Sequence, residues 1–105
     1  MNTAIARFSV LEGKEEEALA VLRKMVSAVQ ANEPGALAYI CHRSRQNPSE
    51  IVFFEVYRND EASRAHGETP HMREFAANFA QIFDASQVKI DLLERVDGFV
   101  RAEAG

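Results

Sequence analysis

The segment at residues 51–57 constrains the fold most, because it is apolar on both sides of an extended backbone. Successive side chains of a strand point to opposite faces of a sheet. One face of this segment carries Ile51, Phe53 and Tyr57, and the other carries Val52, Phe54 and Val56. A layer of helices covers only one face of a sheet. The segment therefore predicts a strand whose second apolar face needs a further partner.

The residues before this strand predict a strand, a helix and a second strand. Residues 4–10 alternate in polarity, as a half-buried strand does. Residues 14–31 repeat apolar side chains at helical spacing, at Ala18, Leu22, Met25, Val26 and Val29. Pro34 disfavours helical geometry at Glu33, so the helix should end there. Residues 36–44 then predict the second strand, with Tyr39 and His42 on opposite faces.

The residues after it predict a helical turn, a second helix and a last strand. Asn59 or Asp60 can cap a turn that ends at Gly67, and Thr69 with Pro70 is a good start for a helix. In that helix the apolar side chains recur at three- and four-residue spacing: Met72, Phe75, Ala76, Phe79, Ile82 and Phe83. Residues 87–96 alternate again and predict the last strand.

This order, strand–helix–strand–strand–helix–strand, predicts a ferredoxin-like α+β fold. Its four-stranded antiparallel sheet carries both helices on one face. We expect a single domain over residues 1–105, with a flexible tail at 97–105. The uncovered apolar face predicts a homodimer in which two sheets pack face to face.

Composition excludes several classes of function. The net charge is −4 and the basic residues are scattered, so nothing resembles a surface for nucleic acid. Cys41 is the single cysteine, which favours a reducing compartment, and we expect a cytoplasmic protein. No apolar run approaches the roughly 20 residues of a membrane span, and no signal-peptide pattern is present.

Several stretches resemble the antibiotic biosynthesis monooxygenase family, which includes quinol monooxygenases. They are residues 33–39, residues 54–57, Ala65 with His66, and residues 69–72. The resemblance implies a homodimeric α+β barrel with one pocket per subunit. It also implies a cofactor-independent monooxygenase that oxidises a small aromatic or quinol substrate with O2, using no metal or flavin. Haem breakdown, known in similar proteins, needs a haem-ligating histidine, a tryptophan and an asparagine. This chain has Ala76, His66 and Ala6 at those three positions, so haem breakdown is disfavoured.

His66, His71 and Glu55 are the candidate catalytic residues under this resemblance. Either imidazole suits a base or a hydrogen-bond donor near neutral pH. The structural alternatives are that His66 caps the end of a helical turn and that His71 is a surface residue of a first helical turn. Glu55 is the only charge in its strand. It needs a donor such as His66, Arg58 or a residue of a second copy, and it can equally serve structure alone.

Tyr39, Phe54, Phe75 and Phe79 are the candidate substrate-binding residues, although Phe75 and Phe79 also fit a hydrophobic core. We expect no metal. A site built from His66, His71 and Glu55 is disfavoured, because the histidines are separated by a Gly/Pro break and match no ligand-spacing motif. Two other functions stay open: a dimeric binding or stress-response module without catalysis, and an isomerase of a small polar metabolite, against which the many phenylalanines argue.

Overall fold

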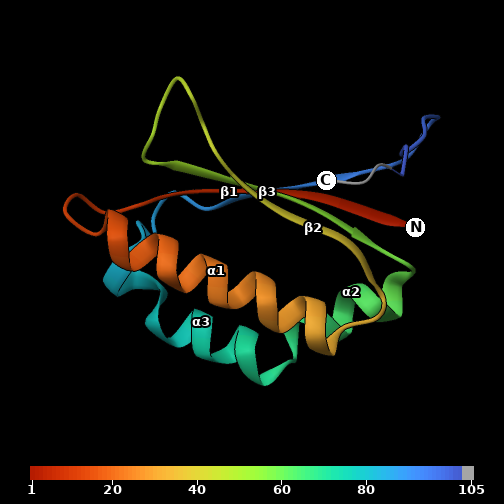
Figure 1. Cartoon of the computed structure of the whole chain (residues 1–105), viewed down its shortest axis with the longest axis horizontal. Coiled ribbons are helices and arrows are strands. Elements are labelled where there is room, and N and C mark those ends of the chain that lie inside the picture. Colours follow the sequence, from red (N-terminus) through yellow and green to blue (C-terminus); the bar gives the residue numbers. More distant parts are fainter. Residues whose placement is uncertain (103–105) are drawn as a thin grey trace.

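The computed structural model describes residues 1–102, and its elements follow the predicted order (Figure 1). The strands are β1 (Asn2–Ser9), β2 (Ala36–Arg43), β3 (Glu50–Tyr57) and β4 (Lys89–Leu93), and the helices are α1 (Glu15–Asn32), α2 (Asp60–Gly67) and α3 (Pro70–Ile82). The sheet order is β2-β3-β1-β4, and all neighbours are antiparallel. The helices form one layer on one side of the sheet (Figure 1). The predicted ferredoxin-like α+β fold is confirmed.

Two elements differ clearly from those predicted. The expected turn before Gly67 is the helix α2, because the Asn59 side chain accepts from the Ala62 N–H at 2.8 Å and starts it. The last strand is shorter than residues 87–96, since β4 pairs only with the part of β1 between Thr3 and Arg7. Of the predicted flexible tail, residues 103–105 lie outside the described residues. Residues 97–102 form neither helix nor strand.

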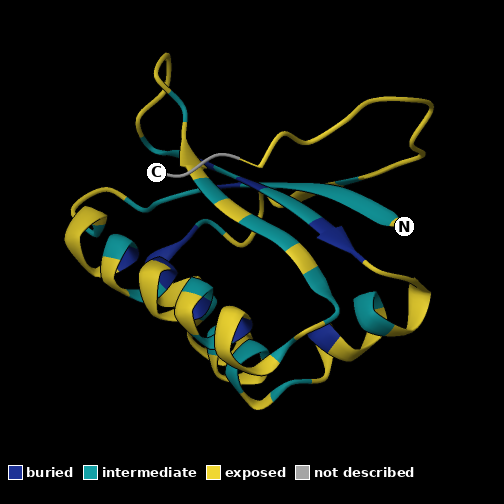
Figure 2. Cartoon of the chain, turned by 45° about the vertical axis from the view of Figure 1, so that its right-hand side comes forward, coloured by how far each residue is buried: buried dark blue, intermediate teal, exposed yellow. Residues whose placement is uncertain are grey.

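The core lies between the sheet and the helices, and Phe8 of β1 is at its centre. Its ring centroid lies 5.0 Å from that of Phe83, 5.3 Å from that of Phe79 and 6.1 Å from that of Phe53. From α1, Ala18 and Leu22 pack onto this cluster. Figure 2 shows the consequence: the buried residues of the helices line the side that faces the sheet. Within the described residues, no helix is both long and apolar enough to cross a membrane.

The opposite face of the sheet is apolar and has no helix over it. Phe54 pairs with Ile5 on one side and with Ile40 on the other, and Ile40 is about half exposed. Beyond β4 the chain turns away from the helices, and the side chains of Val96, Phe99 and Val100 are exposed. The strand pattern thus predicted the second apolar surface correctly. A single chain leaves that surface open.

Candidate functional site

A cavity of about 350 Å³ lies between the sheet and helices α2 and α3. Most of its wall is apolar, and a few polar side chains lie at one end. Its lining residues include Tyr39, Phe53, Glu55, Tyr57, Ser63, His66, Met72, Phe75 and Phe79, with Ile90 and Leu92 of β4 at its open side. Five of the predicted site residues therefore meet at one cavity: His66, Glu55, Tyr39, Phe75 and Phe79.

Phe54 does not line this cavity, although we predicted it as a substrate-binding residue. The reason is the two-residue period of β3. Phe53 and Glu55 face the helices, so Phe54 between them points to the open face of the sheet. Phe53 takes the position that we had assigned to Phe54.

His66 is held by Glu33, a residue that sequence reasoning did not select. Nδ1 of His66 lies 3.0 and 3.1 Å from the two carboxylate oxygens of Glu33. His66 is near the end of α2, whereas Glu33 directly follows α1, so the fold brings together residues 33 positions apart. The His66 ring bonds to Glu33 and to no helix carbonyl among the described residues. The alternative of a helix-capping histidine is therefore not what the structure has.

His71 contacts the same carboxylate from a third element. The Thr69 side chain accepts from the Met72 N–H at 3.2 Å and starts α3, which places His71 in its first turn. Nε2 of His71 lies 2.6 Å from Oε2 of Glu33. The side chains of Glu33, His66 and His71 are only 9%, 10% and 16% exposed. His71 is thus a largely covered partner of Glu33 and not the surface histidine of the alternative.

Glu33 was missed because its position has an obvious structural explanation. It precedes Pro34, and we interpreted the pair only as the end of a helix. Its backbone N–H does bond to the Val29 carbonyl at 2.9 Å, as a helix end requires. The available signal was that Glu33 opens the first stretch of family resemblance. A carboxylate at the end of a helix gave no geometric reason to connect it with the histidines.

Glu55 finds its donor within its own strand. The Tyr57 hydroxyl donates a short hydrogen bond to Oε1 of Glu55, and neither His66 nor Arg58, the partners we expected, bonds to it in the described chain. Burial, and then the hydrogen bond to Glu55, raises the pKa of the Tyr57 phenol well above its usual range. Burial and the charges of Glu55 and Glu33 do the same to the pKa of Tyr39. Both phenols remain protonated donors at neutral pH.

The aromatic rings place His66 between the two tyrosines. Its ring centroid lies 5.3 Å from that of Tyr39 and 5.5 Å from that of Tyr57. Because Nδ1 bonds to Glu33, Nε2 is the nitrogen left for the cavity. Over residues 1–102, Nε2 has no hydrogen-bond partner, and no side-chain nitrogen is both fully buried and unpartnered. Nε2 is therefore not fully buried, and because His66 lines the cavity we place Nε2 at the cavity wall.

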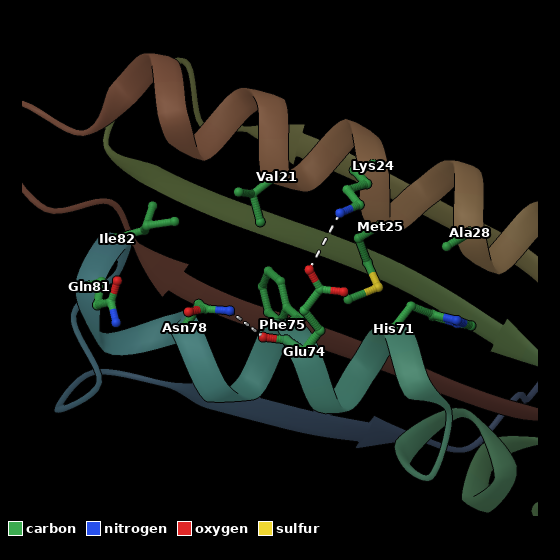
Figure 3. Close-up of a pocket in the computed structure, with 10 residues that line it drawn as sticks. All are labelled: Val21, Lys24, Met25, Ala28, His71, Glu74, Phe75, Asn78, Gln81 and Ile82. Atoms are coloured by element: carbon green, nitrogen blue, oxygen red, sulfur yellow. Dashed lines mark hydrogen bonds and ion pairs between the residues drawn. The ribbon is translucent and has the colours of Figure 1, made fainter.

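On the other side, His71 lies at one end of a second and smaller space, a groove of about 220 Å³ between α1 and α3. Figure 3 shows its ring beyond Met25, at the end of the groove, with the Lys24–Glu74 ion pair of 3.4 Å bridging the groove farther along. His66, Glu33 and His71 thus form a continuous hydrogen-bonded chain from the cavity to this groove. Such a chain can orient a base and can carry a proton.

The family comparison agrees with this architecture. The family model described as antibiotic biosynthesis monooxygenase matches residues 1–78, which include all three members of the hydrogen-bonded chain. The chain belongs to the antibiotic biosynthesis monooxygenase family. The predicted resemblance is confirmed. The remaining residues of the chain, which include β4, lie beyond the match.

Solved structures resemble this family member over nearly its whole length. PA3566 from Pseudomonas aeruginosa is 29% identical and has a TM-score of 0.82, covering 91% of this chain and 94% of its own. A Caulobacter crescentus protein, described provisionally as an antibiotic biosynthesis monooxygenase, is 27% identical with a TM-score of 0.84, covering 91% and 90%.

A relative that matches in sequence is less informative about function. An uncharacterised protein of Synechocystis sp. is 32% identical over 62 residues, or 59% of this chain. The match spans about two fifths (42%) of that relative's length. These similarities establish the family and the fold of this member. They leave its reaction to be inferred from the site.

Proposed function

We propose that the protein is a cofactor-independent monooxygenase that oxidises a small phenol or hydroquinone with O2. The observation that carries the proposal is the placement of His66: its Nδ1 is fixed by Glu33, while its Nε2 meets an apolar cavity. An apolar space of about 350 Å³ with a few convergent polar groups suits one small aromatic molecule. Family membership supports the same reaction class.

His66 would act as the general base. Nδ1 carries its proton toward the Glu33 carboxylate, so Nε2 holds the lone pair that accepts the phenolic proton. Glu33 then stabilises the imidazolium, as the carboxylate does in other acid–histidine pairs. His71 shares the carboxylate and would relay the proton toward the groove between α1 and α3. The Tyr39 hydroxyl, which has no protein partner in residues 1–102, would donate to the phenolate oxygen.

The substrate would supply all of the electrons. The phenolate passes one electron to O2, and the resulting radical pair combines to form a ring carbon–oxygen bond. Loss of water from the hydroperoxide cleaves the O–O bond. A hydroquinone and one O2 thus give a hydroxyquinone and one water, and no external reductant is required. Because Phe53, Phe75 and Phe79 line the cavity, the wall favours an aromatic ring over a polar metabolite.

A second copy of the chain would cover apolar surface that a single chain leaves exposed. Ile90 and Leu92, at the open side of the cavity, are 62% and 83% exposed. The open face of the sheet at Phe54 and Ile40 is also apolar. Each buried side chain of this size contributes about 1.5–3 kcal/mol. We therefore include a homodimer in the proposal, with the two open faces packed together, and sedimentation at micromolar concentration tests it.

The activity test is oxygen uptake with a panel of hydroquinones, in chelator-treated protein with no added flavin. Removing a general base lowers turnover by about 10²–10⁴-fold, and we expect this for His66→Gln. Glu17→Gln, which changes an exposed glutamate of α1, is the matched control and should keep full turnover. Full turnover in the His66 variant would overturn the role of His66.

The same panel separates catalysis from simple binding. If the protein is a binding module, ligands raise its melting temperature while no oxygen is consumed. If it is a monooxygenase, the ligands that stabilise it also drive oxygen uptake. Stabilisation by polar metabolites alone would favour the isomerase alternative.

A further inference from the structure

The mostly buried cluster of Glu33, His66 and His71 has the composition of a transition-metal site. One ligand atom from each residue can be chosen so that all three lie within 4.8 Å of one another. The residues come from three different elements, the end of α1, α2 and α3, so the backbone fixes their separation. No lysine or arginine bonds to the Glu33 carboxylate in the part of the chain that the structure describes. Its charge is shared only with two imidazoles.

The ligand atoms lie near the spacing that one bound ion would require. Metal bonds to imidazole nitrogen and carboxylate oxygen are about 2.0–2.2 Å long, so neighbouring ligand atoms around one ion are about 3.0–3.4 Å apart. Oε2 of Glu33 lies 2.6 Å from Nε2 of His71 and 3.1 Å from Nδ1 of His66, and the two nitrogens lie within 4.8 Å of each other. Seating an ion among these atoms therefore needs the two imidazoles to move toward each other by at most about 1.5 Å.

We propose that Glu33, His66 and His71 bind one divalent transition-metal cation, with Zn²⁺ as the reference ion, in place of their hydrogen bonds. Two imidazoles and one carboxylate suit zinc, copper, nickel or ferrous iron, and not magnesium or calcium, which prefer oxygen ligands. The ligands would be Nδ1 of His66, Nε2 of His71 and one oxygen of Glu33. Water would complete the coordination.

Metal binding would also change what His66 presents to the cavity. A nitrogen that binds a metal cannot carry a proton, so the proton of a neutral His66 must move from Nδ1 to Nε2. Nε2 would then be a donor and no longer a base. This consequence rests on the proposed function: the cation would inhibit a reaction that begins with proton abstraction by His66. Binding of the cation itself does not depend on that function.

The binding test uses tag-free, chelator-treated full-length protein titrated with Zn²⁺ in a calorimeter. We expect one Zn²⁺ per chain. Loss of an outer-shell partner of a metal site already costs about 10–100-fold in affinity, so Glu33→Gln and His71→Asn, which remove direct ligands, should each weaken binding at least about tenfold. The matched controls Glu17→Gln and His42→Asn change an exposed glutamate and the third histidine, and should bind as the wild type does.

Cobalt substitution supplies a readout that does not depend on heat or activity. Co²⁺ in a site with two imidazoles should give visible absorption bands that disappear in Glu33→Gln. Equal Zn²⁺ affinity in wild type and Glu33→Gln, or loss of binding in His42→Asn, would overturn the site and leave adventitious binding only. If one Zn²⁺ binds tightly but oxygen uptake is unchanged, the metal site stands and the proposed shift of the proton to Nε2 is overturned. Absence of uptake without metal would instead count against the proposed monooxygenase.

Discussion

The carboxylate of Glu33 lies 3.0 Å from Nδ1 of His66, although the two residues are 33 positions apart in the chain. The contact depends on the end of α1 meeting the end of α2, and it is made on the side of the histidine opposite to the cavity. Because Glu33 is only 9% exposed, its charge is balanced by hydrogen bonds and little by water. Glu33 is therefore both a structural and a positioning residue.

Glu33→Gln should destabilise the protein as well as lower its activity. The amide keeps the shape of the side chain but replaces a charged acceptor of two imidazole N–H groups. Hydrogen bonds to charged groups are worth about 1.5–3 kcal/mol, so we expect the free energy of unfolding in urea to fall by about 1–3 kcal/mol. Glu17→Gln, which loses only an exposed ion pair with Lys14, should change it by less than about 0.5 kcal/mol. Equal stability of the two variants would contradict a buried charge-assisted network.

Tyr57→Phe should be more harmful to stability than Tyr39→Phe. The Tyr57 hydroxyl is the donor to Glu55, and its loss leaves a half-buried carboxylate with no hydrogen-bond partner among residues 1–102. We expect a loss of about 1–3 kcal/mol in the free energy of unfolding. The Tyr39 hydroxyl makes no hydrogen bond to another described residue, so Tyr39→Phe should cost little stability while weakening substrate binding. Chemical denaturation of both variants checks the order, and the reverse order would refute our assignment of the two hydroxyls.

How much could be predicted depended on whether a feature was local. The fold was predictable because β3 is apolar on both faces and because the apolar spacing in α1 and α3 is regular. The helix start at Thr69 was also predictable, since capping depends on adjacent residues. His66 and Glu55 were found as candidates because each is chemically unusual in its segment.

The rest depended on contacts between distant segments. Glu33 joins His66 and His71 only after three elements have packed, and nothing local to Glu33 marks it as part of a site. The donor to Glu55 was missed for a different reason. Tyr57 is two residues away on the same face of β3, so the strand period alone could have indicated it. The placement of Phe54 was wrong by one residue, which in a strand reverses the face.

Alkaline titration should show two tyrosines that resist ionisation. The chain has only two, Tyr39 and Tyr57, and burial raises the pKa of both. A phenol with a raised pKa in the folded state stabilises that state fully below the unfolded value of about 10, and this contribution is lost as pH rises above it. Tyrosinate absorbance should therefore stay low as the pH passes about 10 and then rise together with unfolding. Gradual ionisation near pH 10 with circular dichroism unchanged would contradict the burial.

Gly35→Ala should disturb the geometry that places Glu33 against α2. A Cβ added at Gly35 would lie 2.6 Å from Cβ of Ala62, a rigid methyl group that cannot turn aside. The Gly35 carbonyl also accepts from the Arg58 N–H at 2.8 Å, so the loop cannot easily move away. Overpacking of this kind costs about 1–3 kcal/mol, and a shift of the loop would also lower oxygen uptake.

In Gly67→Ala, the matched control, the new Cβ meets nothing within 4 Å. Alanine in a helix is more favourable than glycine by about 1 kcal/mol, so that variant should be as stable as the wild type or more stable. Thermal unfolding of the pair decides: equal melting temperatures would mean that the close approach of Gly35 to Ala62 does not constrain the site.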